Sequence, residues 1–223
     1  FTSFYNNAIC CATRVSLLTG LYSQQVGGAE RSMGHVTMAE MLKTAGYHTL
    51  MTGKWHLQME LGGLPFERGF DRNYGPTGGG CNYFNPGRRR AGEPEPARKT
   101  PAHGYEVFAI DDQVIQPYTP ENPDYYTTDA FTDRALEYLD EYGPGEDPFF
   151  LYMAYTAPHW PLHARPRDIA KYQGRYKVGW DHLREQRMQR LLEMGLIEER
   201  WALSARDPDA LPLSPAHFMW VAV

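Results

Sequence analysis

A cysteine followed four residues later by an arginine is the pattern in this sequence best suited to chemistry. Cys10 begins the segment Cys-Cys-Ala-Thr-Arg, and Arg14 ends it. Thr19-Gly20 closes the helix that this segment predicts. The unpaired N–H groups and the dipole at a helix N-terminus favour an anionic group, and Arg14 adds a fixed positive charge one turn later. We therefore expect a reactive thiol at Cys10, with a pair of small buried hydrophobic cysteines as the structural alternative.

Two further segments place basic side chains directly after predicted strands. The run from Tyr47 to Thr52 indicates a buried strand, and Lys54 and His56 follow it. The apolar run from Phe149 to Tyr155 indicates a core strand, and His159 follows it between two prolines. Ligands bind at the carboxyl ends of parallel strands, so we expect Lys54, His56 and His159 to lie there. An exposed strand-end lysine and a turn histidine are the structural alternatives.

The elements that must position these residues alternate between helix and strand. Further helices are predicted over about 37–45, from a capping box at Thr37, over 128–142, capped by Thr128, and over 180–194. The 128–142 helix should bury four apolar residues: Phe131, Ala135, Leu136 and Leu139. A small hairpin is predicted over 105–115, and residues 61–104 form a long irregular stretch around Gly78-Gly79-Gly80. The pattern predicts an α/β fold with a mostly parallel sheet and helices on both faces.

Composition narrows the function classes. The chain has 223 residues, 42% of them apolar, and a net charge of −5, which gives no support to nucleic-acid binding. A basic cluster at 88–90, 98 and 99 lies among Gly, Pro and Glu, as in a solvated loop. No apolar run approaches the roughly 20 residues that span a bilayer. Three cysteines, two of them adjacent, indicate neither a disulfide framework nor a zinc site.

Several ordered segments resemble the sulfatase family. The segment from Cys10 to Gly20 resembles the signature Cys-x-Pro/Ala-Ser/Thr-Arg followed by Leu-Thr-Gly, with Ala12 where proline is commoner. Gly53-Lys54-Trp55-His56-Leu57 resembles the second signature of that family. Other matching segments lie at 39–47, 65–71, 82–84 and 155–162. The resemblance implies the alkaline-phosphatase-like fold, with 1–210 as a partial catalytic domain and 211–223 as an unmatched tail.

The resemblance also implies a mechanism for sulfate monoester hydrolysis. In that family the first signature cysteine, here Cys10, is oxidised to formylglycine, whose hydrated diol attacks sulfur. Arg14 and Lys54 would stabilise negative charge on the sulfate and the diol. His56 would accept the proton of the second hydroxyl, and His159 would bind sulfate beside the leaving group.

A calcium ion is the cofactor that the resemblance implies, with the modified Cys10 among its ligands. The family's other calcium ligands are acidic residues upstream of the signature cysteine and an Asp-Asn pair downstream, and neither set is found in this sequence. We therefore expect the other ligands to lie outside this chain, and the chain alone to bind calcium poorly, to have little activity and to be poorly stable. The implied partners are a small-molecule or carbohydrate sulfate ester and a formylglycine-generating or anaerobic sulfatase-maturating enzyme. Family resemblance alone favours a periplasmic or secreted location.

Three other functions stay open from the residues alone. A phosphatase or phosphodiesterase of the same superfamily would use a Ser or Thr nucleophile with zinc. A thiol hydrolase would keep Cys10 as a cysteine. The third is a folded or unstable fragment without activity.

Overall fold

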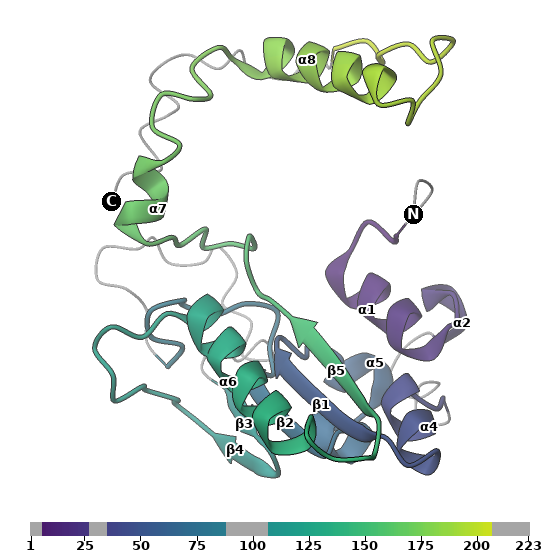
Figure 1. Cartoon of the computed structure of the whole chain (residues 1–223), viewed down its shortest axis with the longest axis vertical. Coiled ribbons are helices and arrows are strands. Elements are labelled where there is room, and N and C mark those ends of the chain that lie inside the picture. The colour runs from purple at the N-terminus through teal and green to yellow at the C-terminus, as the bar shows by residue number, and fades with distance from the viewer. Residues whose placement is uncertain (1–5, 27–34, 88–106, 207–223) are drawn as a thin grey trace. The chain divides into compact units, whose positions relative to one another are not determined.

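The structure is a computed structural model, and it describes residues 6–26, 35–87 and 107–206. These residues fall into two compact units, one ending at His163 and one beginning at Ala164 (Figure 1). The first unit contains a five-stranded sheet in the order β4-β3-β2-β1-β5. Its strands are β1 (His48–Gly53), β2 (Arg72–Pro76), β3 (Phe108–Ile110), β4 (Gln113–Ile115) and β5 (Phe149–Ala154).

The three strands that precede the candidate residues or the glycine run are parallel. β1 pairs in parallel with β2 on one side and with β5 on the other, whereas β3 and β4 form an antiparallel hairpin beside β2. The carboxyl ends of β1, β2 and β5 therefore lie at one edge of the sheet. The predicted hairpin and the mostly parallel pairing are confirmed.

Helices cover both faces of this sheet, as predicted (Figure 1). Met51 of β1 faces a core that includes α1 (Cys10–Thr19), α4 (Met38–Thr44) and α5 (Gln58–Leu61). Tyr74 of β2 points the other way and packs against Phe131 of α6 (Thr127–Tyr142). Successive side chains of a strand point to opposite faces, so these two cores lie on opposite sides of the sheet. Two short elements, α2 (Ser23–Val26) and the 3₁₀ helix η1 (Pro65–Arg68), complete this unit among the described residues.

Local sequence signals predicted the start of α4 and the end of α1 correctly. The Thr37 hydroxyl accepts a hydrogen bond from Glu40 N at 3.1 Å, and the Glu40 carboxylate accepts one from Thr37 N at 2.6 Å. This is the predicted capping box, and it begins the helix at Met38. Gly20 ends α1 in the left-handed conformation with φ of 72°, as its position predicts.

Two details of the predicted core were wrong. β5 was expected to be a core strand, but Phe149 is 43% exposed and Met153 is 39% exposed, since β5 is an edge strand of the described sheet. Leu136 of α6 is 55% exposed, because the buried face runs through Phe131, Ala135 and Tyr138 instead. That helix begins with Tyr126 as its N-cap and has no side-chain cap, so Thr128 does not cap it.

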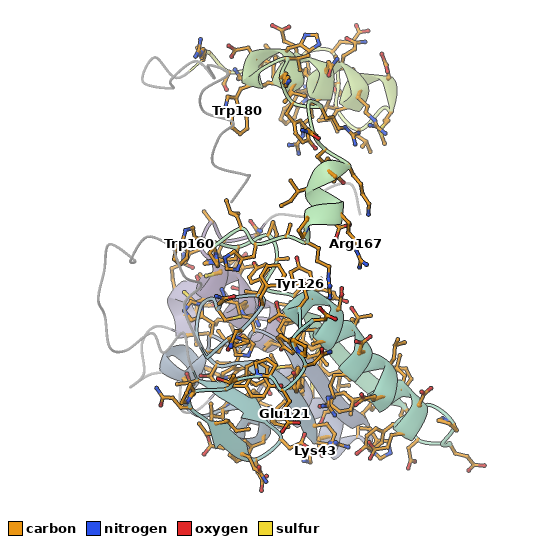
Figure 2. All side chains as sticks on the ribbon, turned by 90° about the vertical axis from the view of Figure 1, so that its left-hand side faces the viewer. Lys43, Glu121, Tyr126, Trp160, Arg167 and Trp180 are labelled. Carbon is orange, nitrogen blue, oxygen red and sulfur yellow. The ribbon has the colours of Figure 1, made fainter. Side chains whose placement is uncertain are left out.

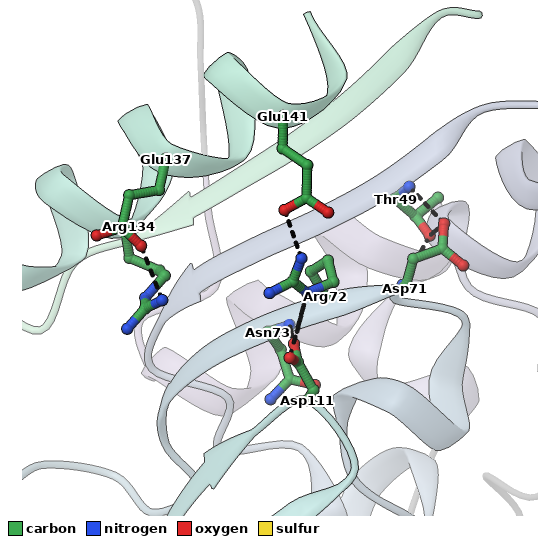
Figure 3. Close-up of polar contacts among 8 residues, drawn as sticks. All are labelled: Thr49, Asp71, Arg72, Asn73, Asp111, Arg134, Glu137 and Glu141. Atoms are coloured by element: carbon green, nitrogen blue, oxygen red, sulfur yellow. Dashed lines mark hydrogen bonds and ion pairs between the residues drawn. The ribbon is translucent and has the colours of Figure 1, made fainter.

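A chain of polar contacts holds the amino end of β2 in place (Figure 3). The Arg72 guanidinium contacts Asp111 in the β3–β4 turn at 3.2 Å and Glu141 of α6 at 2.6 Å. Beside it, the Asp71 carboxylate accepts hydrogen bonds from Thr49 N at 2.9 Å and from the Thr49 hydroxyl at 3.0 Å. These contacts link α6 and the hairpin to the central strands.

The second unit contains α7 (Pro166–Ala170) and α8 (Trp180–Glu193), the latter close to its predicted bounds. Neither helix has a buried residue, and Trp180 at the start of α8 is exposed (Figure 2). Within the described ranges, no helix is both long and apolar enough to cross a membrane.

Candidate active site

Cys10 is the first residue of α1, and its side chain is exposed. Ile9 is the N-cap and supplies no side-chain hydrogen bond to the helix end. Asn7 instead anchors the chain that leads into the helix. Its side-chain amide donates a hydrogen bond to Ser16 Oγ at 3.0 Å, and its backbone carbonyl accepts one from Thr13 Oγ1 at 2.5 Å. The amide groups of the first turn are therefore left without a side-chain cap beside the thiol.

Lys54 and His56 stand on a segment held between the ends of two strands. Lys54 N donates to Ala154 O of β5 at 2.8 Å, and His56 N donates to Thr77 O after β2 at 3.1 Å. Gly53 has a φ of 101°, and a Cβ there would collide with the Ala154 carbonyl, so this tight exit from β1 requires glycine. His56 itself has a φ of 55°, a conformation uncommon for a residue with a side chain.

Lys54 is a buried cation, only 4% exposed. Burial is the largest effect and lowers the pKa of its ammonium group, and the positive charge of Arg14 lowers it further. Cys10, which is also its hydrogen-bond partner, opposes that shift. A bound anion would offset this effect, because a negative charge beside Lys54 stabilises its charged ammonium form.

The other contacts bring the sequence-predicted residues together around Cys10. Its Sγ lies 3.5 Å from His56 Nδ1. Arg14 Nε donates to Trp55 O at 2.8 Å, between Lys54 and His56, and its guanidinium lies 5.4 Å from the centre of the Tyr152 ring. Arg14 Nη2 is buried and has no hydrogen-bond partner among the described residues. A buried donor without a partner is costly, and an anion would satisfy it.

His159 follows β5 and is held by its own turn. Its N–H donates to Thr156 O at 2.9 Å, and its carbonyl accepts from the buried Tyr83 hydroxyl at 2.7 Å. Its Nδ1 lies 2.8 Å from Trp160 O. A carbonyl oxygen only accepts, so Nδ1 carries a proton and Nε2 is the atom left to meet a ligand. His159 joins the group indirectly, through the adjacent Gly79 and Gly80: a Cβ on Gly79 would meet the His56 ring, and a Cβ on Gly80 would meet the His159 ring.

We call Cys10, Arg14, Lys54, His56 and His159 the Cys10 site. Sequence reasoning named all five, but it missed the residues that support them. Gly79, Gly80 and Tyr83 touch the two histidines, and the only sequence signals were the glycine run and the Asn82-Tyr83-Phe84 match.

Three of the other sulfur and imidazole groups, those of Cys81, His163 and His48, have structural surroundings. Burial raises the pKa of the Cys81 thiol to about 12, so this thiol is un-ionised at neutral pH. His163 accepts a hydrogen bond from Tyr83 N at 3.2 Å, and its imidazole packs against the Tyr83 ring. His48 packs on Tyr142. The basic cluster at 88–90, 98 and 99, with His103 and His217, lies outside the described residues.

The described residues of the Cys10 site do not by themselves fit a calcium ion. Calcium takes six to eight oxygen ligands. The side chains here are a thiol, an ammonium, a guanidinium and two imidazoles, and no group of three His, Cys, Asp or Glu suited to a metal occurs within 6–26, 35–87 and 107–206. The arrangement instead suits a small anion bearing several oxygens.

Comparison with known proteins identifies the family. The family described as Sulfatase matches residues 1–195. The chain belongs to the sulfatase family. An uncharacterized sulfatase of Schizosaccharomyces pombe is 30% identical, over 89% of this chain and 38% of its own length. An arylsulfatase of Klebsiella aerogenes is 31% identical, over 89% of this chain and 43% of its own length.

Solved sulfatase structures share the fold. The structure of BT4656 in complex with its substrate D-glucosamine-2-N,6-O-disulfate is 26% identical, with a TM-score of 0.51 over 75% of this chain and 28% of that one. The sulfatase chain thus spans less than half the length of these relatives.

Proposed function

We propose that the protein hydrolyses sulfate monoesters, on an aryl or a carbohydrate group, with a formylglycine nucleophile made from Cys10. The observation that carries the proposal is the exposed Cys10 at the start of α1, with the buried Lys54 ammonium and the His56 imidazole in contact with it. Membership of the sulfatase family supports the reaction class, and the names of its relatives support both substrate types.

The nucleophile forms in two steps. A maturating enzyme supplies a two-electron oxidant, and the Cβ–S bond of Cys10 and one Cβ–H bond break. The sulfur leaves as hydrogen sulfide, and water supplies the oxygen of the aldehyde that replaces the thiol. Water then adds across the aldehyde to give a geminal diol. An exposed cysteine is compatible with the first step, because another enzyme must reach it.

Sulfate transfer uses the cations of the site. One diol hydroxyl attacks sulfur and releases its proton to water, and the sulfur–oxygen bond to the alcohol breaks. His159, in its imidazolium form with protons on both nitrogens, gives its Nε2 proton to the departing oxygen. Lys54 and the Nη2 of Arg14, which has no hydrogen-bond partner in the described part of the chain, stabilise the negative charge that builds on the sulfate oxygens. His56 then takes the proton of the second hydroxyl, the bond between Cβ and the sulfated oxygen breaks, and sulfate leaves as the aldehyde returns.

A calcium ion at this site would need oxygen ligands from outside the described residues, because the described side chains of the Cys10 site supply none of the carboxylates that the ion needs.

Rates on matched aryl sulfate and aryl phosphate esters test the proposal, with the full-length protein produced together with a maturating enzyme. We expect hydrolysis of the sulfate ester to be faster, to be abolished by Cys10→Ala, and to survive Cys11→Ala as the matched control. A faster phosphate reaction would favour the phosphatase reading, and unchanged sulfate hydrolysis in Cys10→Ala would remove the nucleophile from the proposal.

A further inference from the structure

The glycine run after β2 lies against both histidines of the Cys10 site. Thr77, the residue before the run, accepts the hydrogen bond of His56 N. Gly79 and Gly80 follow, and neither has a positive φ. Their backbone conformations are therefore open to alanine, and only the space beside each Cα limits the residue type.

Gly79 adjoins the His56 ring closely. A Cβ at this position would lie 2.9 Å from Cε1, 3.0 Å from Nε2 and 3.4 Å from Nδ1 of His56. The ring has little freedom to withdraw, because its Nδ1 meets Cys10 Sγ at 3.5 Å and its backbone is held at a φ of 55°. A methyl group at Gly79 must therefore displace either the imidazole or the loop that carries it.

Gly80 adjoins His159 in the same way. A Cβ at this position would lie 3.3 Å from His159 Nδ1 and 3.2 Å from Trp160 O. Those two atoms form the 2.8 Å contact that fixes which nitrogen of His159 carries a proton. The contact is tighter than ordinary van der Waals packing, so a methyl group here would push on both partners of that hydrogen bond.

We propose that Gly79 and Gly80 are positioning residues, whose missing side chains set where the imidazoles of His56 and His159 stand. The inference rests on the proposed hydrolysis of sulfate esters for its kinetic consequences, and on geometry alone for its structural ones. Gly79→Ala acts through the group that contacts Cys10, so it lowers kcat. Gly80→Ala acts through His159, which meets the substrate and protonates the departing oxygen, so it raises KM and also lowers kcat. Misplacement of a reacting group by about 1 Å can reduce a rate by about 100-fold.

The kinetic test compares Gly79→Ala, Gly80→Ala and Gly145→Ala in the full-length enzyme. Gly145 is the matched control, because a Cβ there would meet nothing closer than Tyr142 O at 3.4 Å. We expect Gly79→Ala to lower kcat by about 10-fold or more and to shift the pH profile, and Gly80→Ala to lower kcat/KM by a comparable factor through both a lower kcat and a higher KM. Wild-type kcat, KM and pH profile in both variants would overturn the inference.

A structural readout keeps the inference separate from the proposed function. In the NMR spectra of the histidine rings, Gly79→Ala should shift the resonances of His56, Gly80→Ala those of His159, and Gly145→Ala neither. These shifts are expected even in a protein that does not hydrolyse sulfate esters, and unchanged signals would count against the positioning role.

Melting temperatures test the role of Gly79 even if Gly79→Ala is too unstable for kinetic measurements. His56→Ala removes the ring that the new methyl group would meet, so the loss of melting temperature caused by Gly79→Ala should be smaller in the His56→Ala background. An equal loss in both backgrounds would show that the methyl group meets something other than His56, and would overturn the inference for that position.

Discussion

Lys54 shows most clearly how individual residues of this site are arranged for chemistry rather than for stability. A buried ammonium group is costly when no carboxylate accompanies it, and Cys10 and Arg14 are the charged or titratable groups that act on it most strongly. The buried Nη2 of Arg14 carries a similar cost. Groups of this kind persist at functional sites, where binding of an anion removes the cost.

Lys54→Met should therefore lower the activity and raise the stability of the protein. We expect the rate on a sulfate ester to fall by about 100-fold to 1,000-fold, as for removal of one group that stabilises transition-state charge. The free energy of unfolding should rise by about 1 kcal/mol at neutral pH. Kinetics and thermal melting check both effects, with the exposed Lys177→Met as a control that changes neither.

The pH dependence of that gain follows from the lowered pKa. Folded Lys54 releases its proton at a lower pH than unfolded Lys54, whose pKa is near the ordinary value of 10.5. The penalty on the wild type is complete below the lowered pKa and shrinks as the pH rises toward 10.5. The advantage of Lys54→Met should shrink over the same window, and a variant less stable than wild type at neutral pH would contradict this account.

At the scale of elements, the contacts around Asp71 join α4 to the start of β1. Its carboxylate meets Lys43 of α4 at 2.6 Å and accepts hydrogen bonds from the backbone and hydroxyl of Thr49. Burial alone would raise the pKa of Asp71, but the Lys43 and Thr49 donors outweigh it and hold the pKa below the ordinary value of 3.8.

Asp71→Asn should destabilise the fold by about 1–2 kcal/mol at neutral pH, through weaker hydrogen bonds more than through the partly exposed ion pair. Because the folded pKa is depressed, this contribution is present above about pH 3.8 and is lost as the pH falls through the folded value. Chemical denaturation of wild type and variant across that range measures it.

Asp168→Asn is a suitable comparison. Asp168 on α7 also meets a lysine at 2.6 Å, but its side chain is 39% exposed against 27% for Asp71, and no hydrogen bond from a backbone N–H or a threonine hydroxyl to its carboxylate is seen among the described residues, so its removal should leave stability unchanged. Equal effects of the two substitutions would contradict the role given to Thr49.

How far the sequence predicts these elements depends on how local their causes are. The capping box of α4 and the glycine stop of α1 act within a few residues, and both helices begin and end close to where expected. The burial of β5 depends instead on which strands flank it, which an apolar run does not report. The contact of Gly79 with His56 is equally non-local, so the glycine run alone did not reveal it.

At the scale of the whole molecule, the two units differ in how much they bury. The unit that ends at His163 has two helix-covered cores around its sheet, whereas α7 and α8 have no buried residue. Local opening is easiest where few apolar contacts hold the backbone.

Limited proteolysis should report this difference. In the 223-residue chain we expect trypsin to cut within residues 164–206 before it cuts within 35–87 or 107–163. Mass spectrometry of the early fragments gives the order of cleavage. First cuts within β1 or α6 would show that the sheet unit is the less stable of the two.

The chemical state of Cys10 is the property on which the account of this sulfatase depends most. Its most direct measurement is the mass of the tryptic peptide that ends at Arg14, taken from catalytically active full-length protein. The account predicts that position 10 has lost its sulfur and carries an aldehyde that a hydrazide reagent captures. A free thiol at position 10 throughout the active enzyme would contradict it.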